Sequence, residues 1–185
     1  MRKKSVLQIT RTAMFIALLV AAQFATRPLG QFVTGSCVNF ILVTACLLIG
    51  LHLAAAVAVI SPLFAFLLIG VPAFPLLLPF MMAGNLSIII AIHYIAGRPP
   101  EKINKKFIAR ACAAAPLGAL IKFLVMYIGV VQIALSFIPD INQPQINAMA
   151  AVFSWPQLVT ALIGSSLALS IAPTLSKALK SAERG

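Results

Sequence analysis

The longest run of the chain without a charged residue extends from Pro28 to Gly97 and covers 70 residues. A helix that crosses the hydrocarbon core of a membrane needs about 20 residues. The run therefore has room for about three membrane-spanning helices joined by tight turns. A transmembrane β-barrel would show alternating polar and apolar residues, and this run does not alternate. We therefore predict an all-α integral membrane protein.

The composition of the whole chain agrees with a membrane protein. Hydrophobic residues make up 62% of it and charged residues only 9%, whereas soluble domains have about 25% charged residues. The net charge of +11 could indicate a nucleic-acid-binding protein. However, the basic residues are confined to short segments between apolar runs and form no continuous basic face. We expect a single membrane domain over residues 1–185, embedded in the lipid bilayer. We do not expect it to bind nucleic acid.

The apolar runs and the breaks between them predict six spans. A turn around Gly50 and His52, a turn at Val71–Pro75 and a polar loop at Ile138–Asn147 separate some of them. We also expect bends at Pro62 and Pro116, because proline removes a helical hydrogen bond. The predicted spans cover residues 7–25, 32–49, 53–69, 76–96, 107–135 and 152–175.

The distribution of Lys and Arg predicts how the chain is oriented. Six spans place both termini on one side of the membrane. Twelve of the fourteen basic residues then lie on that side, Arg27 lies on the opposite side, and Lys122 lies within the membrane. Because cytoplasmic loops carry an excess of Lys and Arg, we expect both termini to be cytoplasmic in a multi-pass protein of the bacterial plasma membrane.

Several kinds of chemistry have no signature in the sequence. The chain has no phosphate-binding G-x-x-x-x-G-K-[ST] loop, no G-x-S-x-G and no H-E-x-x-H motif. Its three acids, Glu101, Asp140 and Glu183, fall in predicted loops or the tail. Proton-driven pumps usually need a carboxylate inside the membrane. Since the cysteines also lack metal-ligand spacing, we expect neither an enzyme nor a metal site.

Lys122 lies in the middle of a predicted span, about 18 to 20 Å from either end of that helix. An ammonium at mid-depth costs a few kcal/mol, and the predicted spans contain no acid to pair with it. A ligand with a carboxylate, a phosphate or a polarised carbonyl could supply the missing partner. Alternatively, a neutral or water-solvated lysine could bond to backbone carbonyls exposed at a bend near Pro116.

Other polar residues could share a ligand cavity with Lys122. Asn39 and Asn85 lie inside predicted spans, and an unpaired amide in lipid is costly. Both amides should therefore point inward, either to bind a ligand or to bond another helix. Arg27, which lies on the side of the membrane opposite to the termini, is a further candidate for contacting the ligand. Trp155 could stack on a ligand or anchor its helix at the membrane interface.

Small residues recur every fourth position in two predicted spans. The first span carries Ala13, Ala17 and Ala21, and the sixth carries a similar stripe beginning at Gly164. Such stripes let another helix approach closely. They can serve either contacts within the chain or contacts with a partner.

Three segments together resemble a known family. RTAMFIALLVAAQF, GQFVTGSCVNF and LLPFMMAGN are similar to the substrate-binding membrane subunit, or S-component, of energy-coupling factor (ECF) vitamin transporters. Chain length, six spans, basic ends and the alanine stripe fit the same family, and the resemblance covers most of the chain.

The resemblance implies a function. An S-component captures a vitamin or related micronutrient from outside the cell and has no cofactor of its own. The first-helix alanines, here Ala13, Ala17 and Ala21, would dock onto a transmembrane scaffold (T) subunit, which sits on two cytosolic ATPases that use ATP. The segment from Thr26 to Ser36 would gate the pocket. A stand-alone small-molecule permease or channel remains the alternative function.

Overall fold

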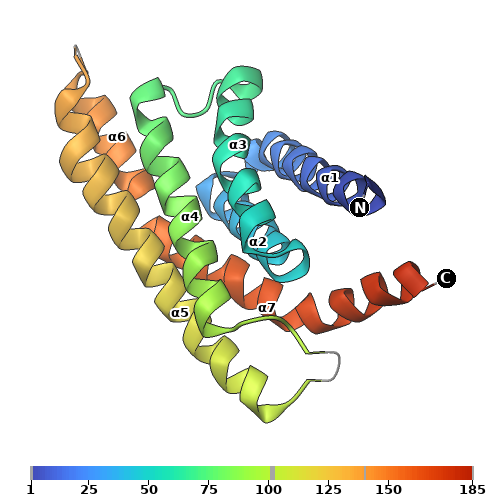
Figure 1. Ribbon diagram of the computed structural model, residues 1–185. Helices are drawn as coiled ribbons and strands as arrows, with labels where there is room; N and C mark the ends of the chain where they lie inside the picture. The colour runs from blue at the N-terminus through green and yellow to red at the C-terminus, as the bar shows by residue number, and fades with distance from the viewer. Residues whose placement is uncertain (1, 101–102, 140, 185) are drawn as a thin grey trace.

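The computed structural model describes residues 2–100, 103–139 and 141–184 and is helical along most of its length (Figure 1). Within these ranges it contains no strand. Six of its segments are long and apolar enough to cross a membrane. The predicted fold class, an all-α membrane protein with six transmembrane helices, is therefore confirmed. Glu101, Lys102 and Asp140, which the sequence places in polar loops, lie outside the described residues.

Seven α-helices and four shorter helical segments make up most of the described part of the chain. The α-helices are α1 Arg2–Thr26, α2 Gln31–Ile49, α3 Leu51–Ile69, α4 Leu78–Ile95, α5 Lys105–Met126, α6 Gln143–Phe153 and α7 Trp155–Arg184. The shorter segments are the 3₁₀-helices η1 Arg27–Leu29, η2 Pro75–Leu77 and η4 Ala134–Phe137, and the π-helical η3 Tyr127–Ile133.

Glycines with positive φ make the first connections very short. Gly50 alone separates α2 from α3, and its φ of 89° is one that a residue with a side chain rarely adopts. Gly30 has a φ of 85° between η1 and α2. The predicted turn at Gly50 and His52 is thus narrower than expected, because His52 already belongs to α3.

The predicted polar loop at Ile138–Asn147 is partly wrong, because helix α6 begins inside it at Gln143. Asn142 caps this helix: its side-chain oxygen accepts a hydrogen bond from the backbone N–H of Gln145 at 2.9 Å, and the Gln145 side chain accepts one from the Asn142 backbone N–H at 3.2 Å. This reciprocal pair is a capping box. The sixth predicted span, 152–175, consequently consists of the end of α6 and most of α7.

The fifth predicted span, 107–135, also differs in detail. The chain is α-helical to Met126, and then continues through the π-helical η3 and the 3₁₀-helical η4. A Cβ added at Gly129 in η3 would lie 2.5 Å from the ring of Phe80 on α4. The small residue therefore lets the irregular segment pack closely against α4.

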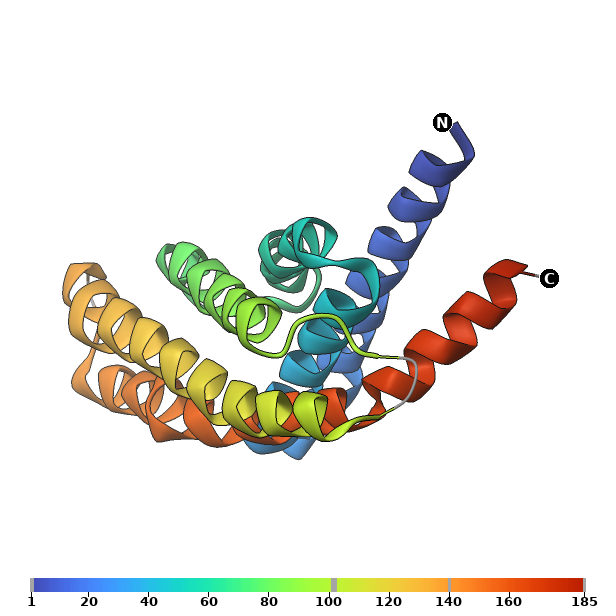
Figure 2. The same cartoon turned by 60° about the horizontal axis from the view of Figure 1, so that its bottom comes forward.

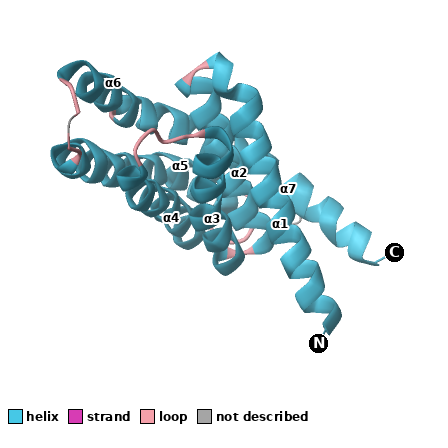
Figure 3. Cartoon of the chain, turned by 90° about the horizontal axis from the view of Figure 1, so that it is seen from above, coloured by secondary structure: helices cyan, strands magenta, loops and turns pink. Residues whose placement is uncertain are grey.

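Helix α2 is the centre of the bundle. It packs against α1, α3, α4 and α7, and its residues 41–47 are all buried. A helix that is apolar on every side can be stable only where other helices surround it. Figure 1 shows α1 on one side of this centre and α5 with α6 on the other. Both termini lie at the same end of the molecule (Figures 2 and 3).

A glycine allows α7 to cross α2 at close range. A Cβ added at Gly164 would lie 2.5 Å from the carbonyl oxygen of Ser36 and 2.7 Å from the Cβ of Asn39. Ala168 and Ala172, which continue the stripe along α7, are fully buried. This stripe of small residues therefore serves contacts within the chain.

We predict that Gly164→Ala destabilises the protein by about 1 to 3 kcal/mol, because the added methyl group pushes backbone against backbone. The measurement is the free energy of unfolding in detergent micelles. Gly118→Ala is the matched control on α5, since its Cβ would meet Ile92 at an ordinary 3.5 Å. Equal stability of the two variants would contradict the close crossing of α2 and α7.

Candidate functional site

A cavity of about 310 Å³ lies in the half of the bundle away from the termini. Its walls come from the end of α1, the start of α2, α3 with its connection to α4, the first half of α4, the end of α5, the end of α6 and the start of α7. The lining residues are Gln23, Gln31, Thr34, Gly35, Val38, Asn39, Pro62, Val71, Pro72, Ala73, Leu77, Met81, Asn85, Lys122, Met126, Ala148, Met149, Val152, Phe153 and Gln157. The volume is at the lower end of the range for small-molecule sites, about 300 to 1,000 Å³.

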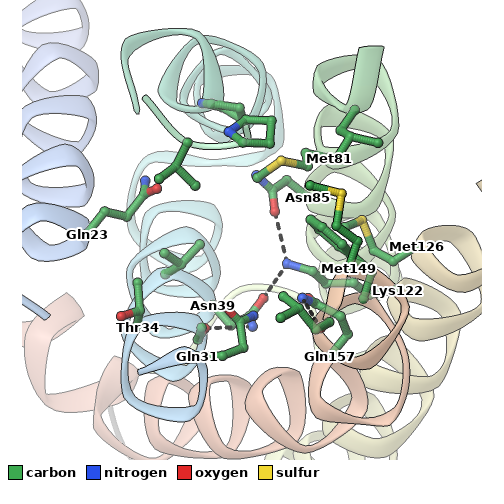
Figure 4. A pocket seen from close by; sticks show the side chains of 18 of the residues that line it. Gln23, Gln31, Thr34, Asn39, Met81, Asn85, Lys122, Met126, Met149 and Gln157 are labelled. Carbon is green, nitrogen blue, oxygen red and sulfur yellow. Dashed lines mark hydrogen bonds between the residues drawn. The ribbon is translucent and has the colours of Figure 1, made fainter. Parts of the chain in front are cut away.

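Lys122, Asn39 and Asn85 come together at this cavity (Figure 4). The Lys122 Nζ donates hydrogen bonds to Asn39 Oδ1 at 2.6 Å and to Asn85 Oδ1 at 2.9 Å. The exposed fractions of the three side chains are 3%, 1% and 6%. Side chains from α2, α4 and α5 thus form one buried polar cluster, which we call the amide–lysine cluster.

The other end of each amide is bound to the backbone. Asn39 Nδ2 donates to the carbonyl oxygen of Gly35 at 2.8 Å, and Asn85 Nδ2 donates to that of Ala58 at 3.4 Å. Each amide oxygen is therefore turned toward the lysine, and the cluster also connects α4 to α3.

The acceptors of Lys122 differ from the backbone carbonyls considered for a bend near Pro116. They are two amide oxygens, which carry partial negative charge and no net charge. An ammonium has three N–H donors, and Lys122 makes two hydrogen bonds among the described residues. One donor therefore remains for an acceptor that enters the cavity.

Three methionines form an apolar wall beside the cluster. Figure 4 shows Met81, Met126 and Met149 gathered on one side of Lys122. Met126 lies over Gly84, where an added Cβ would collide with its sulfur atom. No sequence signal marks these residues, because a methionine in an apolar run cannot be distinguished from ordinary helix packing.

Additional polar side chains line the cavity. Gln23 was not predicted to be among them, although a glutamine within an apolar span is as unusual as Asn39. Thr34 donates to the carbonyl oxygen of Thr26 at 2.9 Å, and Gln157 donates to that of Val152 at 3.2 Å. Gln31 begins α2, so most of the segment from Thr26 to Ser36 is helical.

Arg27 and Trp155, both selected from the sequence, lie outside the cavity lining. Arg27 lines a smaller neighbouring hollow that shares Gln23, Gln31, Thr34 and Val71 with the cavity. Its guanidinium donates to the Ile69 carbonyl oxygen at 2.9 Å. Trp155 is 59% exposed and packs against Phe32, with ring centroids 5.5 Å apart. For these two amphipathic side chains, the sequence indicates a depth in the membrane but not the direction in which the side chain points.

The alanine stripe of the first helix faces outward. Ala13, Ala17 and Ala21 are exposed, whereas Phe15 and Leu19 on the opposite side of α1 are buried in the core. The described part of the chain uses the α7 stripe internally but leaves the α1 stripe uncovered.

A second and larger cavity, of about 600 Å³, lies between α5 and α7. Its lining is apolar apart from two serine hydroxyls and the thiol of Cys112. No group of three or more His, Cys, Asp or Glu that could hold a metal ion occurs among the described residues. The cavity with the amide–lysine cluster is therefore the better candidate for recognising a polar ligand.

Comparisons of the chain with protein-family models, with curated protein sequences and with solved structures found no match.

The cluster predicts a non-additive response to mutation. Asn39→Leu removes one acceptor of Lys122 and should cost about 1 to 3 kcal/mol. The double variant Asn39→Leu/Lys122→Met should lose less free energy of unfolding than the two single variants lose together. The difference should be about 1 to 3 kcal/mol. The measurement is a double-mutant cycle on the free energy of unfolding.

Gln157→Leu provides the control for that cycle, because Gln157 lines the same cavity and makes no hydrogen bond to Lys122. Its effect should add to that of Lys122→Met within about 0.5 kcal/mol. An additive result for Asn39 as well would contradict the cluster.

Proposed function

We propose that the chain is the substrate-binding membrane subunit, or S-component, of an ECF-type importer for a vitamin or related micronutrient. It binds the substrate and catalyses no reaction. ATP is used by two ATPases on separate subunits, and a transmembrane scaffold subunit joins them to this chain. The resemblance of Arg11–Phe24, Gly30–Phe40 and Leu77–Asn85 to that family is the starting point of the proposal.

The observation that carries the proposal is the amide–lysine cluster at the cavity. A buried charge that served only to hold helices together would have all its donors satisfied within the protein. Lys122 keeps one donor and lines a cavity of about 310 Å³ together with six uncharged polar side chains. This arrangement is typical of a small-molecule site, which combines an apolar wall with a few convergent polar groups.

The charge pattern supports the orientation that uptake requires. With both termini cytoplasmic, as the excess of Lys and Arg near them favours, the cavity lies in the outer half of the membrane. A subunit that captures a scarce solute from outside a bacterial plasma membrane needs its binding site in that half.

The outward-facing alanines of α1 support the proposal that this chain binds a partner subunit. Ala13, Ala17 and Ala21 present a surface without large side chains on a helix whose other face is anchored by Phe15 and Leu19. Small-residue surfaces allow backbones of neighbouring membrane helices to come close together. We assign this face to the scaffold subunit.

Lys122→Met should abolish or sharply weaken substrate binding, by about tenfold or more, because a hydrogen bond from a charged group is lost. Native mass spectrometry of the purified protein, searching for a co-purified vitamin-sized molecule, provides the measurement. Lys106→Met, on an exposed part of the same helix, is the control and should keep the ligand. Unchanged binding in folded Lys122→Met protein would refute the ligand role of Lys122.

Ala17→Trp should block assembly with the scaffold subunit and the ATPases while sparing substrate binding by the isolated chain. The indole would fill the space that a close-packed helix needs. Copurification of the complex is the measurement, and Leu67→Trp on the exposed side of α3 is the control. Normal assembly of Ala17→Trp would refute the docking face. Uptake by this chain alone in liposomes would instead favour a stand-alone permease.

A further inference from the structure

The hydrogen-bonding capacity of the amide–lysine cluster restricts the ligand. Asn39 and Asn85 both use their Nδ2 groups on backbone carbonyls and their oxygens on Lys122. The remaining donor of the Lys122 ammonium is therefore the one charged donor that the cluster offers, beside a second N–H on each asparagine amide. A ligand completes the cluster with an acceptor, and an anionic acceptor gives a stronger, charge-assisted hydrogen bond.

The number of charges around the cavity restricts the ligand further. Lys122 is the one charged side chain in the described lining. Arg27 lies in the neighbouring hollow, which adjoins the cavity at Gln23, Gln31, Thr34 and Val71, and its guanidinium donates to the carbonyl oxygen of Ile69 instead of lining the cavity. A single negative charge would be balanced here. A phosphate with two charges would keep one uncompensated, and a cation would face the ammonium without a carboxylate nearby.

The apolar wall indicates an aliphatic body. Met81, Met126 and Met149 are flexible side chains that adapt to irregular shapes. Phe153 supplies the one aromatic ring in the described lining, whereas a flat, extended ring system is usually recognised by stacking on aromatic side chains. A volume of about 310 Å³ has room for on the order of ten to twenty non-hydrogen atoms.

Neutral polar groups lie across the cavity from the methionines. Figure 4 shows Gln23 and Thr34 on the side opposite Met126 and Met149. The side-chain amides of Gln23 and Gln31 make no hydrogen bond to another described residue, so they have both donors and acceptors left. They fit an uncharged group such as an amide, a urea or a hydroxyl.

We infer that the ligand of this cavity is a small monocarboxylate with an aliphatic body and an uncharged polar group at its other end. The carboxylate accepts from Lys122, the body lies against the methionines, and the polar end meets Gln23 and Gln31. This inference rests on the proposed function as a substrate-binding subunit and adds the chemical class of the substrate.

The test uses compounds that share one body and differ in the terminal group. 6-Acetamidohexanoate represents the class. Its methyl ester, the corresponding primary amine and the corresponding phosphate monoester change the charge, and hexanoate lacks the amide end. Equilibrium dialysis against the purified full chain in detergent, with protein-free micelles as the blank, gives the five affinities.

The acid should bind about tenfold more tightly than its ester, and Lys122→Met should reduce that preference to about twofold or less. Gln23→Leu should retain the preference for acid over ester but lose the advantage of 6-acetamidohexanoate over hexanoate. Equal or tighter binding of the ester, amine or phosphate overturns the inference. Failure of the acid to bind at about 10 mM, together with retention of no monocarboxylate in the second arm below, also overturns it.

A second arm separates this inference from the proposed function. The protein is incubated with the pooled small molecules of a bacterial extract, and bound compounds are identified by mass spectrometry. Retention of a monocarboxylate of this kind supports both ideas. Retention of a cation, a phosphate or a flat aromatic compound overturns the class and leaves the proposed function standing. If no compound binds in either arm, both fail.

Discussion

The contact of the Lys122 ammonium with two asparagine oxygens is the interaction on which this structure depends. A charge at the middle of a membrane protein costs several kcal/mol unless polar groups surround it. Asn39 Oδ1 at 2.6 Å and Asn85 Oδ1 at 2.9 Å provide that environment without a carboxylate. Because amide oxygens carry no full charge, they lower the cost of burial and leave the positive charge available to attract an anion.

The same contact sets where the helices meet. Asn39, Asn85 and Lys122 belong to α2, α4 and α5, and Asn85 also bonds to the backbone of α3. Membrane helices have little hydrophobic attraction for each other, so hydrogen bonds and close packing determine their positions. Gly164 contributes the close packing by letting α7 lie against the backbone of α2 beside Asn39. The shape of the cavity therefore follows from one cluster and one glycine contact.

Sequence reasoning could find the polar members of the site because polarity inside an apolar run is itself a signal. Lys122, Asn39 and Asn85 stand out at once, and their inward direction follows from the cost of leaving them in lipid. The methionine wall could not be found, since Met81 and Met126 look like any residue of a helix core. The positions of Arg27 and Trp155 depend on the rotation of their segments about the helix axis, which depth alone does not give.

The helix boundaries show a similar division between local and distant information. The six apolar runs determine six spans because length and hydrophobicity are local properties. The start of α6 is also encoded locally, in the capping box of Asn142 and Gln145. The segment was nevertheless predicted to be a loop because it is polar. The π-helical segment Tyr127–Ile133 was not foreseeable, because its packing of Gly129 against Phe80 of α4 depends on a residue far away in the sequence.

The mutual dependence of the residues in the amide–lysine cluster has a consequence for how such a site can change during evolution. Lys122 and Asn39 are 83 residues apart in the chain, yet neither can be exchanged without disturbing the other. A descendant that lost the lysine alone would retain two amide oxygens facing an apolar interior. One that lost an asparagine would retain a poorly solvated charge. The three positions should therefore be inherited together or replaced together, although they lie on three different helices.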